Sequence, residues 1–406
     1  MDRKSILAMV AVSFLVVGNL IGAGILALPV NTGLAGVWPS MVGMLVLGGA
    51  MYATALILGR EAVEARADSF NYPSLYQRYL GQAGKWVAIL ANMLILYGLL
   101  TAYLTGGAKI IGDLLGVSTD WQWLLLLVFF AALTTLALLD NRLILRYNAL
   151  IMLVMLSSFL LLVSISWRHV DSTHFAYRDW HYLPAAAPII VTAFHFHNVI
   201  PNVCRNMDWN LGRIWKVMLV GMLLGFLMNM LWIQVGVGVL TMDDGPNGIL
   251  TAFHENLPAT VPMARIIGSR LFTVFSMAFA LLAIVTSYLA NGLGLQGFVR
   301  DMLENHCGVR NRTANAVLTF GPPLVISLVY PDVFLKALNV VGGVGIVILF
   351  GILPAVILLR KFHNRALRIA GWALLLLFSV CLVCEVLHET GLLRLHAHME
   401  YWNPRH

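Results

Sequence analysis

The chain has 406 residues, of which 60% are apolar and 11% are charged, and its formal net charge is +7. About a quarter of the residues in a soluble domain are charged, so this composition excludes an ordinary soluble enzyme or binding module. The positive charges are scattered at the ends of apolar stretches and form no basic stripe, which argues against a nucleic-acid partner. The composition therefore predicts an integral membrane protein.

Apolar stretches long enough to cross a bilayer recur along the whole chain. In chain order they predict an all-α protein with eleven transmembrane helices, at 6–30, 34–58, 86–112, 121–139, 143–167, 184–204, 215–240, 265–298, 314–330, 333–359 and 369–388. The connections are too short for a separate folded domain, so we expect one transmembrane domain over residues 1–406. The first span has no cleavage pattern, and we expect it to be retained.

The basic residues predict the orientation of these spans. With a cytoplasmic amino terminus, most of the 26 Lys and Arg residues fall in the inner segments, as the positive-inside rule requires. An odd number of spans then places the carboxyl terminus outside.

The first span contains the sequence GNLIGAG at residues 18–24, in which Gly22 and Gly24 flank Ala23. Glycine costs a helix about 1 kcal/mol relative to alanine, and backbone groups released inside a bilayer must find new partners. We therefore expect an interruption that lines a cavity, where free amides can hold a carboxylate. The spacing of Gly18 and Gly22 also fits a close helix–helix contact, so packing remains an alternative.

The sixth span contains the sequence TAFHFHNVIPN at residues 192–202. Pro201 removes a backbone donor and clashes one turn back, near His197, which frees the backbone at 195–198. Polar and ionisable residues at this depth indicate a functional site unless they only bridge helices. A second interruption is therefore predicted here.

The two interrupted spans are the first and the sixth, so each begins a set of five. This pattern is typical of an inverted repeat that binds its substrate at the interface of the two halves. The repeats would cover about 6–167 and 184–359, with 369–388 as an extra helix. Other polar side chains placed on the same cavity are Tyr97, Tyr103, Asn148, Thr286, Ser287, Asn291 and Asn339, although each serine or threonine alone often bonds to its own helix.

Segments 18–29, 191–202, 283–303 and 320–338 resemble the bacterial hydroxy/aromatic amino acid permeases, particularly the tyrosine- and tryptophan-specific members. These belong to the amino acid, polyamine and organocation transporter superfamily. The resemblance implies eleven spans, the five-plus-five repeat with discontinuous helices 1 and 6, and a location in the inner membrane. It also implies import of tyrosine, tryptophan or phenylalanine by ion-coupled symport with alternating access.

The resemblance further implies which residues hold the substrate. They are Gly22, Ala23, Gly24, Ile25, Tyr97, Ala193, Phe194, His195, Phe196 and Asn198. In that fold the glycine segment binds the substrate carboxylate and the carbonyls of span six bind its ammonium, which agrees with the dipoles of two opposed helix ends. The rings of Tyr97, Phe194 and Phe196 favour an aromatic side chain.

The coupling ion is left open between proton and sodium. Proton-coupled relatives often carry a lysine early in span five, where this chain has Asn148. In sodium-coupled relatives the ion site corresponds to Gly18, Ile21, Ala283, Thr286 and Ser287. A proton route through His195 or His197 is the alternative, and the family favours the proton. We expect no cofactor and no metal other than sodium.

Three other function classes compete with transport. A membrane enzyme would need a nucleophile with a base or paired carboxylates inside the spans, and the sequence presents neither. A channel favours a continuous polar lining, whereas polarity here gathers at two helix breaks. An amino-acid sensor without transport remains an alternative. Among transporters, a serine/threonine permease of the same family also remains an alternative.

Overall fold

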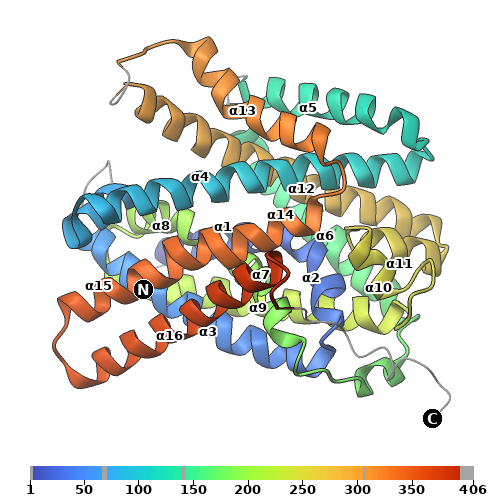
Figure 1. The fold of residues 1–406 in the computed structure, drawn as a ribbon, viewed down its shortest axis with the longest axis horizontal. Coiled ribbons are helices and arrows are strands. Elements are labelled where there is room, and N and C mark those ends of the chain that lie inside the picture. The colour runs from blue at the N-terminus through green and yellow to red at the C-terminus, as the bar shows by residue number, and fades with distance from the viewer. Residues whose placement is uncertain (1–2, 66–70, 139–141, 305–307, 394–406) are drawn as a thin grey trace.

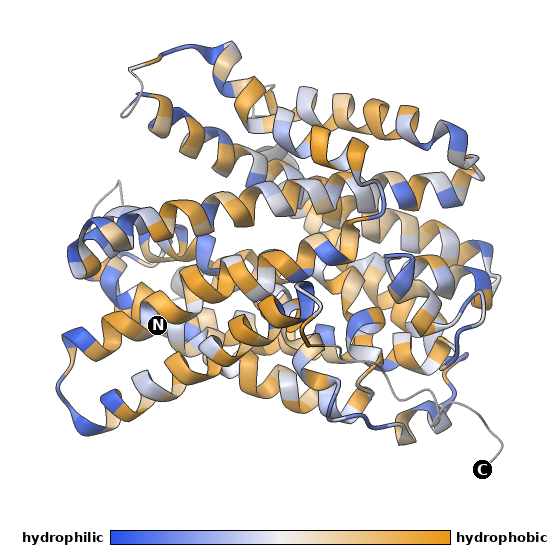
Figure 2. Ribbon diagram, viewed as in Figure 1, coloured by the Kyte–Doolittle hydropathy of each residue, from blue (hydrophilic) through white to orange (hydrophobic). Residues whose placement is uncertain are grey.

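The computed structural model describes residues 3–65, 71–138, 142–304 and 308–393. In these ranges the chain is helical, and its β structure is one isolated bridge between Thr241 and Gly248. Most of the long helices run roughly along the long axis of the molecule (Figure 1). Apolar residues cover the helix shafts and hydrophilic residues gather at the ends (Figure 2). The predicted all-α membrane fold is confirmed.

The first half of the chain forms α1 (Arg3–Leu20), α2 (Ala23–Gly33), α3 (Val37–Ala65), α4 (Tyr72–Leu115), α5 (Gln122–Leu138) and α6 (Arg142–Trp167). The second half forms α7 (Leu183–Ala193), the 3-10 turn η3 (His197–Val199), α8 (Ile200–Asn206), α9 (Leu211–Val239), α10 (Ile249–His254), α11 (Thr260–Ile267), α12 (Arg270–Met302), α13 (Arg312–Val329), α14 (Phe334–Val340), η5 (Val341–Ile352), α15 (Leu353–Lys361) and α16 (Arg365–Glu389). Two further 3-10 turns are η1 (Thr119–Trp121) and η2 (Ser172–Ala176).

The described residues contain eight helices long and apolar enough to cross a membrane, or nine if the bent pair Ile6–Leu20 and Gly24–Gly33 is one span. α5 is a shorter apolar helix, and α13 occupies the predicted ninth span. Eleven spans and the inverted repeat therefore stay predictions.

Side chains cap the amino ends of the long helices. In each case an Asn or Ser accepts a hydrogen bond from a backbone amide in the first turn, at Asn71, Asn210, Ser269, Asn311 and Asn364. Such caps satisfy amides that the helix itself leaves without partners. They fix where the helices begin at the two polar ends of the molecule.

The tenth predicted span contains a π-helix, η5, which is wider than an α-helix and is rich in glycine. Its glycines let it approach its neighbours closely, because Gly342 lies against the Pro188 carbonyl of α7 and Gly345 against Ile95 of α4. Long π-helical stretches are rare and often mark functional regions. Here the element brings Phe350 against the second helix break.

Candidate functional site

The first interruption lies between α1 and α2, whose axes are bent by 53°. Gly22 caps α2 in an extended conformation and has no side chain to bond the first amides of the helix. The amides of Ala23 and Gly24 therefore lack intrahelical acceptors, and the helix dipole adds partial positive charge at the same place. A helix amino end of this kind can bind an anion, and it lies where the sequence predicted a break.

The second interruption lies between α7 and α8. α7 ends at Ala193, and Pro201 falls in the first turn of α8, where a missing amide hydrogen is tolerated. Between them the His195 amide bonds the Thr192 carbonyl at 3.2 Å. The last carbonyls of α7 give this end a partial negative charge, which attracts a cation. Both predicted interruptions are confirmed.

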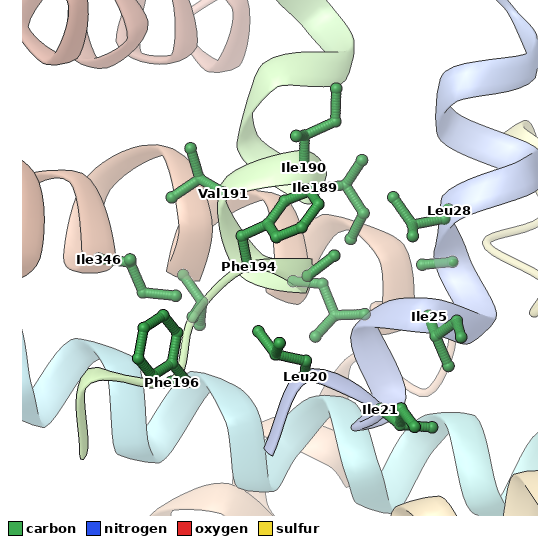
Figure 3. Packing of buried hydrophobic residues seen from close by; sticks show 14 of the residues in the cluster. Leu20, Ile21, Ile25, Leu28, Ile189, Ile190, Val191, Phe194, Phe196 and Ile346 are labelled. Atoms are coloured by element: carbon green, nitrogen blue, oxygen red, sulfur yellow. The ribbon is translucent and has the colours of Figure 1, made fainter. Parts of the chain in front are cut away.

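The two interruptions lie side by side. A Cβ atom placed on Gly24 would lie 3.5 Å from both the Cα and the amide nitrogen of Ala193. Figure 3 shows Leu20 and Ile25 on either side of the first break, with Phe194 at the end of α7 nearby. The positive end of α2 thus adjoins the negative end of α7.

A cavity of about 660 Å³ lies along both breaks, within the size range of small-molecule sites. Seven of the predicted site residues line it: Gly18, Gly22, Gly24, His195, Asn198, Thr286 and Ser287. Tyr103 and Asn291, which the sequence placed on the cavity with less specificity, also line it, and Asn291 Nδ2 bonds the Tyr103 hydroxyl at 3.3 Å. The structure therefore brings most of the polar candidates to one cavity.

Other predicted residues lie behind the cavity wall. Phe194 stacks on Phe226, with ring centres 6.3 Å apart, and Phe196 is fully buried beside Ile346 (Figure 3). Tyr97 donates a hydrogen bond to the Leu318 carbonyl at 2.7 Å. Ile21, Ile25, Ala193, His197 and Ala283 are buried and do not line the cavity, and Asn339 bonds Asn31 instead. The side chains of Ala23 and Asn148 lie outside the described residues.

The two histidines have different surroundings. His195 lines the cavity, and among the described residues its Nε2 atom has no hydrogen-bond partner. His197 is tied down, because its Nε2 atom lies 3.0 Å from Thr54 Oγ1 and its carbonyl accepts a hydrogen bond from the Tyr72 hydroxyl. Phe350 stacks on both rings at about 5 Å. Of the two, only His195 lines the cavity, although the buried Nδ1 atom of His197 also has no hydrogen-bond partner among the described residues.

α12 contributes two hydroxyl groups to the cavity, those of Thr286 and Ser287. A Cβ atom on Gly22 would lie 3.2 Å from Ser287 Oγ, so this hydroxyl adjoins the first break. Thr286 donates to the Leu282 carbonyl at 2.7 Å, which leaves its oxygen lone pairs as acceptors. The described residues contain no group of three or more His, Cys, Asp or Glu that could hold a metal.

Several lining residues were missed by the sequence reasoning. They are mainly apolar, and include Leu99 on α4 with Met152 and Leu156 on α6, together with Asn19 and Asn206. The signal was present for two pairs, since Leu99 with Tyr103 and Met152 with Leu156 are each four residues apart and share a helix face. Apolar residues of this spacing are common in every span, so the pattern alone did not select them.

From the two helix breaks, the cavity extends toward the amino end of α1 and the carboxyl end of α8. It reaches Ala11 and Phe14 on α1 and Asn206 at the end of α8. Beyond the break, the residues of α2 from Gly24 onward are buried. The amide of Ala259 also bonds the Leu26 carbonyl at 2.9 Å, which joins the α10–α11 segment to α2. The cavity is therefore closed on the α10–α11 side.

These features define a class: a multi-pass helical membrane protein with a central cavity at two adjoining helix interruptions. Residues 5–388 match the tryptophan/tyrosine permease family, and the chain belongs to this family. The membership confirms the resemblance seen in the sequence and identifies a permease and not an enzyme.

Individual relatives cover most of the chain. The tyrosine-specific transport system 1 of Haemophilus influenzae is 30% identical over 336 residues, which are 81% of this chain and 82% of the relative. The tryptophan-specific transport protein of the same organism is 25% identical, over 88% of this chain and 90% of the relative. A manganese transporter of Eremococcus coleocola has a similar structure, with a TM-score of 0.63 at 15% identity over 99% of this chain and 92% of that chain. That likeness concerns the fold alone.

Proposed function

We propose that this protein carries an aromatic amino acid, namely tyrosine, tryptophan or phenylalanine, into the cell across the cytoplasmic membrane. The observation that carries the proposal is the contact of Gly24 with Ala193 beside the cavity. It sets a helix amino end next to a helix carboxyl end, as a zwitterion requires. The tyrosine- and tryptophan-specific relatives support the aromatic class.

In this proposal the α-carboxylate binds the amides of Ala23 and Gly24 at the start of α2. The α-ammonium binds the last carbonyls of α7 and the polar side chains of the second break that line the cavity. Each pole then meets a preorganised dipole that needs no charged side chain, which suits a ligand that must also be released. The His195 side chain and Ser287 Oγ would supply further polar contacts at the two ends.

The aromatic ring would lie against the apolar part of the cavity, between Leu99, Tyr103 and Met152. Rings in such contacts gain about 0.5–1.5 kcal/mol beyond the burial of area. In the present state the cavity lining separates the ligand from Phe194, Phe196 and Tyr97. These three residues would support the site by packing against the lining residues.

The transport cycle is proposed to be alternating access. The amino terminus is taken as cytoplasmic, so the cavity opens inward and the α10–α11 segment closes the outer side. Motion of the two broken helices relative to α4, α6 and α12 would then expose the same site to the outside. Symport with a proton, or with sodium at Thr286 and Ser287, would drive uptake.

Uptake of labelled tyrosine into proteoliposomes, with competition by tryptophan, phenylalanine, serine and threonine, tests the proposal. We expect uptake above that of protein-free vesicles, with aromatic competitors strongest. Stronger competition by serine or threonine would assign the protein to the hydroxy amino acids. Binding of tyrosine without uptake, under both a pH and a sodium gradient, would make it a sensor.

A further inference from the structure

A second, smaller pocket lies far from the helix breaks, between α4, α11 and α12. Its volume is about 220 Å³, and it is lined by Ile110, Asp113, Thr260, Val261, Ala264, Arg265, Thr273 and Ser276. α11 lies beside α12 at the end of the molecule where α4 leads into α5 (Figure 1). In the proposed orientation this is the outer end.

The pocket holds polar atoms that the protein leaves unused. Thr260 is 3% exposed, and neither its Oγ1 atom nor Asp113 Oδ2 has a hydrogen-bond partner among the described residues, although both atoms are buried. Buried polar atoms nearly always have a hydrogen-bond partner. Two residues with such atoms line one pocket, where a ligand could supply the missing hydrogen bonds.

The charges in the pocket indicate what the ligand is. Arg265 Nη2 lies 3.7 Å from Asp113 Oδ1, farther than the roughly 2.7–3.2 Å of a direct hydrogen bond. Arg265 and Asp113 thus form an ion pair without a direct hydrogen bond. The Arg265 side chain is 45% exposed, at the edge of the pocket. An inorganic cation at Asp113 would be repelled by this guanidinium, whereas a molecule with both charges would satisfy the two groups together.

The remaining walls fit the same ligand. Ile110, Val261 and Ala264 supply apolar surface. The hydroxyls of Thr273 and Ser276 donate to carbonyls of their own helix segment, at 3.2 and 2.9 Å, and keep their lone pairs for an ammonium. The pocket thus combines a carboxylate, a guanidinium, free hydroxyl oxygens and an apolar wall.

Its position relates it to the central cavity. Asp113 is ten residues beyond Tyr103 on α4, and Ser276 is eleven residues before Ser287 on α12, so the pocket lies about 15 Å outward at a rise of about 1.5 Å per residue. Between them, Gly107 of α4 packs against Phe129 and Ile284. The two spaces share two helices but are separate in this state.

We infer that this pocket is an outer binding site for a second zwitterionic amino acid, with its ammonium on Asp113 and Thr260 and its carboxylate on Arg265. The site collects substrate at the outer surface while the central cavity faces inward. The choice of an amino acid as ligand rests on the proposed function.

Equilibrium binding of labelled tyrosine to the purified protein tests the inference through the number of sites. The wild type should bind two molecules per chain. At the tyrosine concentration that just fills both of its sites, Asp113→Asn should bind one, because loss of a charge-assisted contact weakens the outer site by about tenfold or more. Thr260→Val keeps the shape of the side chain and should weaken the same site. Asp120→Asn removes an exposed carboxylate from the same end, outside the pocket, and should still bind two.

The Gly24→Val variant separates the two proposals, because it should lose the central site and keep the outer one. One molecule bound by the wild type, lost in Gly24→Val and kept in Asp113→Asn, would overturn the outer site and leave the proposed function intact. One molecule lost in Asp113→Asn and kept in Gly24→Val would support the outer site and contradict the central one.

Discussion

The two helix interruptions approach each other at Gly24 and Ala193. The space at Gly24 admits one more carbon atom at ordinary van der Waals distance, 3.5 Å from the backbone of Ala193 and from Thr192 Cγ2, and no branched side chain. The distance between the positive end of α2 and the negative end of α7 is therefore set by a residue without a side chain.

Substitution of Gly24 should consequently depend on size. Gly24→Ala should bind and transport tyrosine nearly as well as the wild type. In Gly24→Val the added methyl groups meet Ala193, and overpacking of this kind costs about 1–3 kcal/mol, so uptake should fall about tenfold or more. Uptake per inserted protein measures this. Equal uptake by the alanine and valine variants would place the substrate elsewhere.

The hydrogen bond between Thr54 and His197 should stabilise the second break. Both side chains are fully buried, and the Thr54 Oγ1 to His197 Nε2 distance is 3.0 Å. Thr54→Val keeps the shape but leaves the imidazole nitrogen unpaired, which costs about 1–3 kcal/mol. The apparent Tm of the purified protein should drop in Thr54→Val and much less in Thr54→Ser. Equal Tm values for the two variants would show that the bond contributes little.

Lys361 pairs with two carboxylates at the polar end of the bundle, and we expect mainly one of these ion pairs to stabilise the protein. Lys361 Nζ lies 2.6 Å from Glu61 Oε1, whose side chain is 1% exposed, and it also pairs with Glu64, which is 44% exposed. Lys361→Ala leaves the buried Glu61 with the Tyr79 hydroxyl alone and should cost about 3 kcal/mol.

The Glu64→Gln variant is the control, since an exposed ion pair contributes about 0–1 kcal/mol. Thermal unfolding of the two variants should therefore separate clearly, with Lys361→Ala unfolding first. If Glu64→Gln destabilises the protein as much as Lys361→Ala, the buried pair is not the main contribution.

Two sets of side chains in the cavity are the candidates for binding the coupling ion. Sodium would use the hydroxyl oxygens of Thr286 and Ser287, whereas a proton would use His195. Uptake is measured with a pH gradient and a sodium gradient imposed separately, for Thr286→Ala with Ser287→Ala and for His195→Ala. Sodium-driven uptake lost in the double variant supports the ion site. Proton-driven uptake lost only in His195→Ala excludes it.

Sequence reasoning located the two breaks because their causes are local. Gly22 and Gly24 weaken a helix wherever they stand, and Pro201 removes a donor and blocks the preceding turn. Hydrophobic length likewise predicted the membrane class without tertiary information. The contact of Gly24 with Ala193 joins residues 169 positions apart, and its distance comes from the packing of α2 on α7.

The lining of the cavity was harder to predict for the same reason. Tyr97 and Tyr103 lie on one helix, and the sequence does not tell which hydroxyl faces α12 and which bonds the carbonyl of α13. Phe194 adjoins the second break but is turned toward α9 and α3, where Phe226 and Gly48 accommodate it. The rotation of a helix about its axis depends on all of its neighbours at once. The π-helix η5 was not predicted, because the sequence there shows no special feature other than its glycines.

Inhibition of tyrosine uptake by substrate analogues tests the two-pole site most directly. Tyramine lacks the carboxylate, and 3-(4-hydroxyphenyl)propionate lacks the ammonium, while both keep the ring. Each should fail to inhibit labelled tyrosine uptake into proteoliposomes at concentrations where unlabelled tyrosine abolishes it, because each leaves one helix end without its charge. Inhibition by either analogue as strong as that by tyrosine would contradict a site that holds both poles.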